Sequence, residues 1–185
     1  MNLPNRLTLL RVILIPIFVF AFLFDPSVTQ SGKDWICFVI YVVAGLTDWL
    51  DGYIARKNDL VTDFGKLMDP LADKLLNAAA LICFTAIGIL NPVVAIVIIS
   101  REFLVTGIRM IAAAKGKVIA ADIWGKLKTI SQDITIGIIL FNRAATETTL
   151  LSIISEAGVL IMTVLTVISA VNYCYKNRAL FSGTK

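Results

Sequence analysis

Residues 48–73 read DWLDGYIARKNDLVTDFGKLMDPLAD, with apolar sequence on both sides. Asp48 and Asp51 are three residues apart, and Asp69 and Asp73 are four apart, so each pair projects from one face of a helix. Where two such helices meet, four carboxylates converge in an apolar setting, and only bound cations make their repulsion tolerable. The stretch therefore predicts a metal site inside a membrane.

The composition is that of a membrane protein. Of the 185 residues, 58% are hydrophobic and 16% are charged, and the mean hydropathy is +0.85, whereas soluble domains carry about 25% charged residues. We expect one all-α domain over residues 1–185, a polytopic bundle of six transmembrane helices with about 20 mostly apolar residues each. A short interfacial segment at 2–8 precedes predicted spans at 9–24, 35–57, 66–90, 93–114, 122–141 and a last helix that ends near Tyr175.

The distribution of positive charge predicts the orientation. Six spans place both termini on one side, and with that side in the cytoplasm only Lys33 and Arg143 of the 17 lysine and arginine residues lie outside. We therefore expect a multi-pass protein of the cell (inner) membrane whose termini and aspartates face the cytoplasm. The basic residues flank apolar segments instead of forming a soluble basic face, so we expect no nucleic-acid partner. A signal peptide is the alternative for the first span, but no small-residue cleavage site follows Phe24.

The residue types limit the chemistry. The chain contains no histidine, and its three cysteines lie singly in apolar stretches. Ser-His-Asp and Cys-His catalysis are therefore excluded, and the available ligands argue against zinc. Carboxylates without nitrogen or sulfur partners suit Mg²⁺ or Mn²⁺, and paired metals stabilise the attacking and leaving oxygens of phosphoryl transfer. The alternative is a small transporter that uses the aspartates as a path for cations or protons.

The pattern D-x2-D-G-x2-A-R-x8-G-x3-D-x3-D is matched at every position of residues 48–73. It resembles the signature of the CDP-alcohol phosphatidyltransferases, a family of six-helix membrane enzymes. The resemblance implies that Asp48, Asp51, Asp69 and Asp73 bind two divalent ions, Mg²⁺ or Mn²⁺. It also implies that Asp73 is the catalytic base on the acceptor hydroxyl, whose oxygen attacks the phosphorus next to diacylglycerol while CMP leaves.

The same resemblance assigns the residues between the aspartates. It implies that Gly52, Arg56, Thr62 and Gly65 hold the CDP moiety of CDP-diacylglycerol, and that the protein is a homodimer in membrane lipid. An arginine can bind phosphate bidentately, and glycines let a nucleotide approach the backbone. A transporter has no need of such residues at this spacing, which argues against that alternative.

Charged residues in the fourth and fifth predicted spans bear on the acceptor alcohol. Arg101, Arg109, Lys126 and Lys128 would form a cluster suited to an acceptor that carries its own phosphate, because charges at such depth must pair or line a polar cavity. The alternative is that Glu102 neutralises Arg101 and that the lysines reach the membrane interface. A regular helix cannot aim both lysines the same way, so at least one of them has another role.

Several segments resemble the bacterial members of the family that use sn-glycerol 3-phosphate, namely residues 2–11, 62–74, 101–103 and 125–132. This resemblance implies that CDP-diacylglycerol and glycerol 3-phosphate give phosphatidylglycerol phosphate and CMP, a step of phospholipid biosynthesis. The alternative is a sister enzyme that uses inositol phosphate, phosphatidylglycerol or serine. The basic residues argue against a neutral alcohol but do not exclude inositol phosphate.

Overall fold

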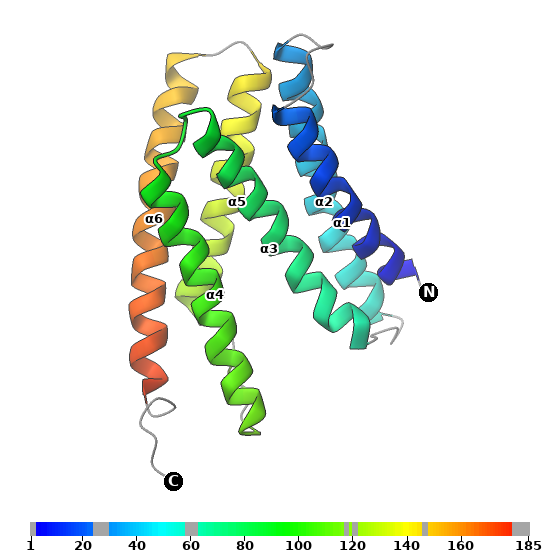
Figure 1. Ribbon diagram of the computed structural model, residues 1–185, viewed down its shortest axis with the longest axis vertical. Helices are drawn as coiled ribbons and strands as arrows, with labels where there is room; N and C mark the ends of the chain where they lie inside the picture. The colour runs from blue at the N-terminus through cyan, green and yellow to red at the C-terminus, as the bar shows by residue number, and fades with distance from the viewer. Residues whose placement is uncertain are drawn as a thin grey trace.

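The computed structural model describes residues 3–23, 30–57, 63–116, 119, 122–145 and 148–178, without the side chains at 3–6, 30–31, 49–57, 63–67, 69–70 and 114. This part of the chain is all-helical and holds six helices, as the sequence predicted, and no strand (Figure 1). The helices are α1 (Leu3–Leu23), α2 (Gln30–Lys57), α3 (Asp63–Ala86), α4 (Pro92–Ala114), α5 (Ile123–Ala144) and α6 (Thr149–Lys176).

The predicted start of the first helix and the predicted end of the third helix are wrong, and the local sequence explains both. The interfacial segment expected at 2–8 belongs to α1 from Leu3 onward, because a proline such as Pro4 is tolerated in the first helical turn, where amides lack intrahelical acceptors. The third helix ends at Ala86 instead of residue 90. Gly88, with φ of 78°, takes the left-handed conformation that ends helices, and Asn91 then caps α4 by accepting from the Val93 amide at 2.9 Å.

The helices form a bundle with one open end. Figure 1 shows α1 beside α2 at one flank and α6 at the other, with α5 packed against both α2 and α6 and with α3 and α4 in front. From the turn that joins them, α3 and α4 spread apart toward the end of the bundle where both ends of the described chain lie. This divergence leaves room for a cavity that side chains of both helices line.

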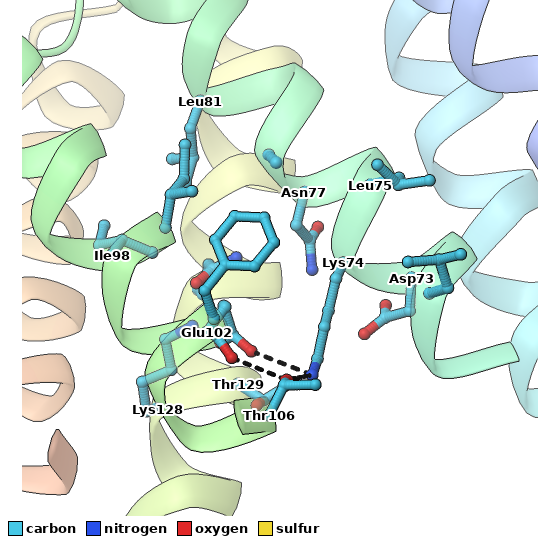
Figure 2. A pocket seen from close by; sticks show the side chains of 15 residues that line it. Asp73, Lys74, Leu75, Asn77, Leu81, Ile98, Glu102, Thr106, Lys128 and Thr129 are labelled. Carbon is cyan, nitrogen blue, oxygen red and sulfur yellow. Dashed lines mark hydrogen bonds and ion pairs between the residues drawn. The ribbon is translucent and has the colours of Figure 1, made fainter. Parts of the chain in front are cut away.

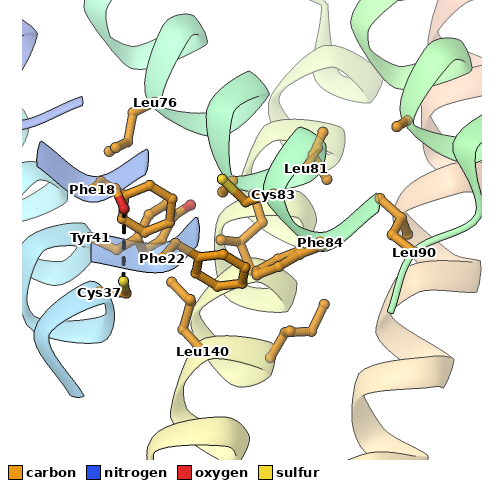
Figure 3. Packing of buried hydrophobic residues seen from close by; sticks show 14 of the residues in the cluster. Phe18, Phe22, Cys37, Tyr41, Leu76, Leu81, Cys83, Phe84, Leu90 and Leu140 are labelled. Carbon is orange, nitrogen blue, oxygen red and sulfur yellow. Dashed lines mark hydrogen bonds between the residues drawn. The ribbon is translucent and has the colours of Figure 1, made fainter. Parts of the chain in front are cut away.

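The apolar core lies on the side of the bundle toward the α3–α4 turn (Figure 3). Phe22 of α1 and Phe84 of α3 meet with ring centroids 5.8 Å apart, and Leu140 of α5 is fully buried beside them. Cys37 and Cys83 are buried free thiols in this core. The core takes residues from all six helices, and a smaller apolar cluster of Val105, Ile108 and Tyr173 joins α4 to α6.

Helices α5 and α6 approach each other closely at two places along their length. A Cβ atom at Gly158 of α6 would lie 2.8 Å from the Thr135 hydroxyl of α5, so only glycine lets the two backbones approach this closely there. At the end that carries the C-terminus, the Lys176 ammonium donates to Asp122, the residue before α5, at 2.8 Å. This hydrogen bond from Lys176 holds the pKa of Asp122 below its ordinary value.

The prediction of six spans is not confirmed by helix hydropathy. Within the described residues, α6 alone is both long and apolar enough to cross a membrane, with a mean hydropathy of 2.2 over its best window, and α1 holds a shorter apolar stretch at Leu7–Leu23. In α4 and α5 the apolar sequence is interrupted by the charged residues described below.

Candidate functional site

A cavity of about 180 Å³ lies between α3, α4 and α5 (Figure 2). Apolar side chains such as Leu81, Ile98 and Phe103 form one part of its wall. The other part is polar and includes Asp73, Lys74, Asn77, Glu102, Lys128 and Gln132. A hydrocarbon wall beside convergent polar groups is the usual make-up of a small-molecule site.

Two of the four motif aspartates have described side chains, Asp48 on α2 and Asp73 on α3. The Arg11 guanidinium donates to Asp48 Oδ1 at 2.6 Å. Asp73 lies in the cavity wall. Oxygen donors without nitrogen or sulfur fit a hard divalent cation such as Mg²⁺ or Mn²⁺.

The other residues of the motif lie outside the described part of the structure. Thr62 is not described at all, and only the backbone is described at Asp51, Gly52, Arg56, Gly65 and Asp69. Among the residues that are described, no group of three or more potential metal ligands occurs. The four-aspartate metal site and the CDP-binding residues therefore stay predictions.

Arg11 is a site residue that the sequence analysis did not identify. It was counted among the basic residues at the cytoplasmic end of the first span, but its side chain is only 1% exposed and pairs with Asp48 inside the bundle. The reason is that α1 begins at Leu3, which moves Arg11 two turns into the helix. A buried arginine needs an anionic partner. An arginine within an apolar run was the available signal.

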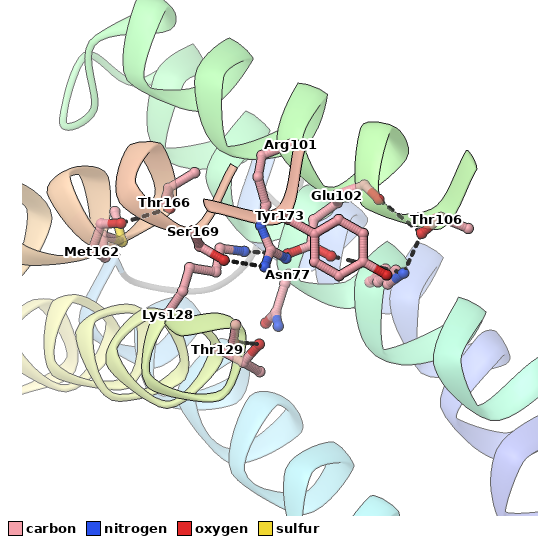
Figure 4. A network of polar contacts seen from close by, with 12 residues as sticks. Asn77, Arg101, Glu102, Thr106, Lys128, Thr129, Met162, Thr166, Ser169 and Tyr173 are labelled. Atoms are coloured by element: carbon pink, nitrogen blue, oxygen red, sulfur yellow. Dashed lines mark hydrogen bonds and ion pairs between the residues drawn. The ribbon is translucent and has the colours of Figure 1, made fainter. Parts of the chain in front are cut away.

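Glu102 of α4 is the centre of an ion cluster that joins three helices (Figure 4). Its Oε1 accepts from Arg101 Nη1 at 3.3 Å and from Lys128 Nζ of α5, and its Oε2 lies 3.8 Å from Lys74 Nζ of α3. Arg101 and Lys128 are 7% and 1% exposed. The alternative in which Glu102 only neutralises Arg101 is thus too narrow, because the same carboxylate also meets two lysines.

The predicted acceptor-phosphate residues separate into two groups. Arg101 and Lys128 are buried around Glu102, whereas Lys126 is exposed, which confirms that the two lysines of α5 point apart. Arg109 Nε donates to the Tyr173 hydroxyl of α6 at 3.2 Å, and its guanidinium lies 5.9 Å from that ring. Of the four residues only Lys128 is in the cavity wall; Arg101, Arg109 and Lys126 are not, and the contact of all four with an acceptor stays a prediction.

A buried hydrogen-bond chain next to the cavity was missed by the sequence analysis. The Tyr41 hydroxyl of α2 donates to Asn77 Oδ1 at 2.8 Å, and Asn77 Nδ2 donates to Asp133 Oδ1 of α5 at 2.9 Å. Asn77 is one turn after Asp73, and Asp73 and Asp133 interact electrostatically. A carboxylate in the apolar sequence of α5 was the signal that could have identified Asp133.

Two buried polar atoms near the cluster have no hydrogen-bond partner among the described residues, Arg101 Nε and Gln132 Oε1. Gln132 is 3% exposed and lies in the cavity wall. Leaving a buried donor or acceptor unpaired costs about 1–3 kcal/mol, and such groups in folded proteins mark places where a polar ligand or water binds. Gln132 Oε1 therefore offers an acceptor to a polar group in the cavity, and Arg101 Nε offers a donor beside the ion cluster.

Comparison with known proteins matches the chain to one family and to named bacterial relatives. The family model described as CDP-alcohol phosphatidyltransferase matches residues 1–171. A Bacillus subtilis protein named CDP-diacylglycerol–glycerol-3-phosphate 3-phosphatidyltransferase is 42% identical over 185 residues, with 95% of each chain covered.

Two further relatives extend the likeness to other bacteria. A Rickettsia felis protein with the same name is 34% identical and covers 93% of each chain. A Mycobacterium tuberculosis protein named probable phosphatidylglycerophosphate synthase is 37% identical over 93% of this chain and 79% of its own. The matched region includes the aspartate motif and the helices that line the cavity. The chain therefore belongs to the CDP-alcohol phosphatidyltransferase family.

Proposed function

We propose that this protein transfers the phosphatidyl group of CDP-diacylglycerol to sn-glycerol 3-phosphate, which gives phosphatidylglycerol phosphate and CMP. Relatives named for this reaction match at least 93% of the chain. The observation that carries the proposal for the acceptor is the buried Lys128 in the wall of the cavity that also holds Asp73, with the buried Arg101 joined to it through Glu102. Buried cations beside a candidate base suit an acceptor with a phosphate at one end and a hydroxyl at the other.

The proposed chemistry begins at Asp73. Its carboxylate takes the proton of the acceptor hydroxyl, the acceptor oxygen forms a bond to the phosphorus next to diacylglycerol, and the bond from that phosphorus to the CMP oxygen breaks. Asp48, Asp51, Asp69 and Asp73 would hold two Mg²⁺ or Mn²⁺ ions, which supply charge stabilisation for the attacking and leaving oxygens. Arg11 fixes the Asp48 carboxylate at the rim of this site.

The substrates would occupy two neighbouring regions. Gly52, Arg56, Thr62 and Gly65 would hold the CDP moiety at the adjoining ends of α2 and α3. The acceptor phosphate would bind Arg101 and Lys128 at the cavity, with Arg109 and Lys126 reached from the open end of the bundle. This arrangement places the acceptor hydroxyl toward Asp73.

We further propose that all six helices span the cell (inner) membrane, with the site and both termini in the cytoplasm, and that the protein works as a homodimer. Large apolar side chains face outward on every helix; Phe103, for example, is 73% exposed. Soluble monomers rarely expose apolar surface on this scale. The charged residues that interrupt α4 and α5 pair with one another inside the bundle, which lowers the cost of placing them in a membrane.

The test is CMP release by the purified protein in detergent with CDP-diacylglycerol and Mg²⁺. Glycerol 3-phosphate, inositol phosphate, inositol and serine are compared, with EDTA as the control. We expect release with glycerol 3-phosphate alone, loss of release with EDTA, and recovery when Mg²⁺ or Mn²⁺ is restored. Release with another alcohol would overturn the acceptor. Protein that is folded but inactive with all four would favour the transporter alternative, which ion uptake into vesicles would then test.

A further inference from the structure

We propose that Glu102 holds the place of the acceptor phosphate. In the acceptor-free site its carboxylate is bound by the same cations, Arg101 and Lys128, that we assign to the acceptor, and Lys74 lies close by. The acceptor phosphate would then displace Glu102 from these cations instead of entering an open site. The inference rests on the proposed function, because it concerns the phosphate subsite of that reaction.

The first support is the way the cations are used. Lys128 is 1% exposed, and its ammonium donates to Glu102, so a phosphate that reaches it from the cavity competes with the Glu102 carboxylate for the same charge. Lys74 donates to the Thr106 hydroxyl at 2.5 Å as well as facing Glu102. In a low-dielectric interior these cations require an anion at all times. Glu102 provides one while no acceptor is bound.

The second support is that Glu102 fits the site incompletely. Arg101 Nη1 faces Glu102 at 3.3 Å and Nη2 donates to the Ser169 hydroxyl at 2.6 Å, but the buried Nε atom has no partner among the described residues. A carboxylate offers two oxygens and one charge. A phosphate monoester offers three oxygens and a charge between −1.5 and −2, so it can satisfy a donor that the glutamate leaves unpaired.

The third support is the position of Glu102 relative to the candidate base. Both Glu102 and Asp73 lie in the cavity wall, on α4 and α3 respectively (Figure 2). A phosphate that takes the place of Glu102 therefore puts the rest of a small acceptor in the space toward Asp73. An alcohol without a phosphate cannot compete with the glutamate for the cations. Selection against neutral alcohols follows from this competition, since specificity often depends on what a site rejects.

The experiment measures binding of inorganic phosphate to the full-length protein in detergent, by calorimetry and by the phosphate-dependent shift of the unfolding temperature. Glu102→Gln keeps the shape of the side chain and removes its charge. We expect the Kd for phosphate to fall by about tenfold and the stabilisation by saturating phosphate to exceed that of the wild type, because a ligand stabilises the state it binds. Weaker or unchanged phosphate binding would overturn the proposal and make Glu102 a residue that only positions the cations.

Two further variants keep the result interpretable. Glu156→Gln removes an exposed carboxylate on α6 and should leave the phosphate Kd at its wild-type value. Glu102→Asp keeps the charge but withdraws it by one methylene, so the Kd should fall by less than in Glu102→Gln. If Glu102→Gln does not fold, this smaller tightening is the deciding result, and an unchanged or larger Kd would overturn the proposal.

Turnover separates this inference from the proposed function. Phosphate binding is measured without CDP-diacylglycerol, so it does not depend on which acceptor the enzyme uses. Tighter phosphate binding in Glu102→Gln together with turnover of a different phosphate-bearing alcohol would leave the role of Glu102 intact and overturn the acceptor. Normal turnover of glycerol 3-phosphate together with weaker phosphate binding in Glu102→Gln would keep the proposed acceptor and overturn the role of Glu102.

Discussion

Two buried ion clusters lie at different heights of this bundle, and they differ in how completely their atoms are paired. Away from the motif, Arg143 of α5 donates to Asp34 Oδ1 through Nε at 3.1 Å and Nη2 at 3.0 Å, and its guanidinium lies 5.3 Å from the ring centroid of Phe22. In the cluster around Glu102, one carboxylate is shared by three cations, and Arg101 Nε has no partner within the described part of the chain.

The difference separates stabilisation from function. The Asp34–Arg143 pair joins residues 109 positions apart and holds α2 against α5 through both oxygens of Asp34. The Glu102 cluster meets a cavity and keeps a donor for a guest. A buried charge by itself indicates neither role. The unpaired atoms are what distinguish a binding site from a structural ion pair.

Replacing the candidate base should have the largest effect on activity. We expect Asp73→Asn to lower the rate of CMP release by about 10³-fold or more, because general-base catalysis alone contributes about 10²–10⁴-fold. Binding of CDP-diacylglycerol should be largely kept, since three aspartates and the CDP-binding residues remain. Single-turnover kinetics and a separate binding titration measure the two quantities. A variant that works at a near wild-type rate would remove Asp73 from its role as base.

Breaking the structural pair should cost stability instead of catalysis. Asp34→Asn leaves Arg143 without its anionic partner, and losing one member of a buried pair destabilises a protein by about 3–5 kcal/mol. Thermal unfolding in detergent should show the loss, while kcat per folded molecule stays at the wild-type value. Glu156→Gln serves as the exposed control, with little effect on either. If Asp34→Asn instead lowered kcat without lowering stability, the contrast between the two clusters would be wrong.

Replacing Arg109 should have a smaller effect, which shows whether this residue belongs to the acceptor site. We expect Arg109→Ala to raise the KM for glycerol 3-phosphate about tenfold, the effect of losing a contact worth roughly 1.4 kcal/mol, while the KM for CDP-diacylglycerol stays nearly unchanged. Lys126→Ala, which removes an exposed cation, should have less effect on the acceptor KM. Steady-state kinetics with each substrate varied in turn gives both constants. A change confined to the CDP-diacylglycerol KM would move Arg109 to the other substrate.

The sequence predicted the helices well because the signals are local. Apolar runs, and the proline, glycine and polar residues between them, located six helices. The start of α4 at Pro92 was predicted to within one residue. The opposed directions of Lys126 and Lys128 also followed from helical periodicity alone. The error at Leu3 arose because residues 2–8 were separated from the apolar run that follows them, whereas α1 is continuous from Leu3.

The partners of the buried charges were beyond reach of the sequence. Asp48 could be assigned to the site from its motif, but its pairing with Arg11 joins positions 37 apart, and nothing local specifies that α1 packs against α2 at this register. Asp133 was overlooked for a related reason. Its role depends on Asn77, 56 positions away, and periodicity within α5 carries no information about α3.

The glycine at position 125 has a consequence for how the chain is assembled. A Cβ atom there would lie 3.2 Å from Arg101 Nη2. The absence of a side chain at Gly125 therefore leaves room for the arginine to pass α5 and reach Ser169. That hydroxyl is synthesised 68 residues after Arg101, a delay of roughly 3–14 seconds at about 5–20 residues per second. During this interval the adjacent Glu102 is the anion available on the same helix. Until α5 and α6 are made, Glu102 is thus the partner that neutralises the Arg101 guanidinium, and the enclosure of this pair has to follow the synthesis of the helices around it.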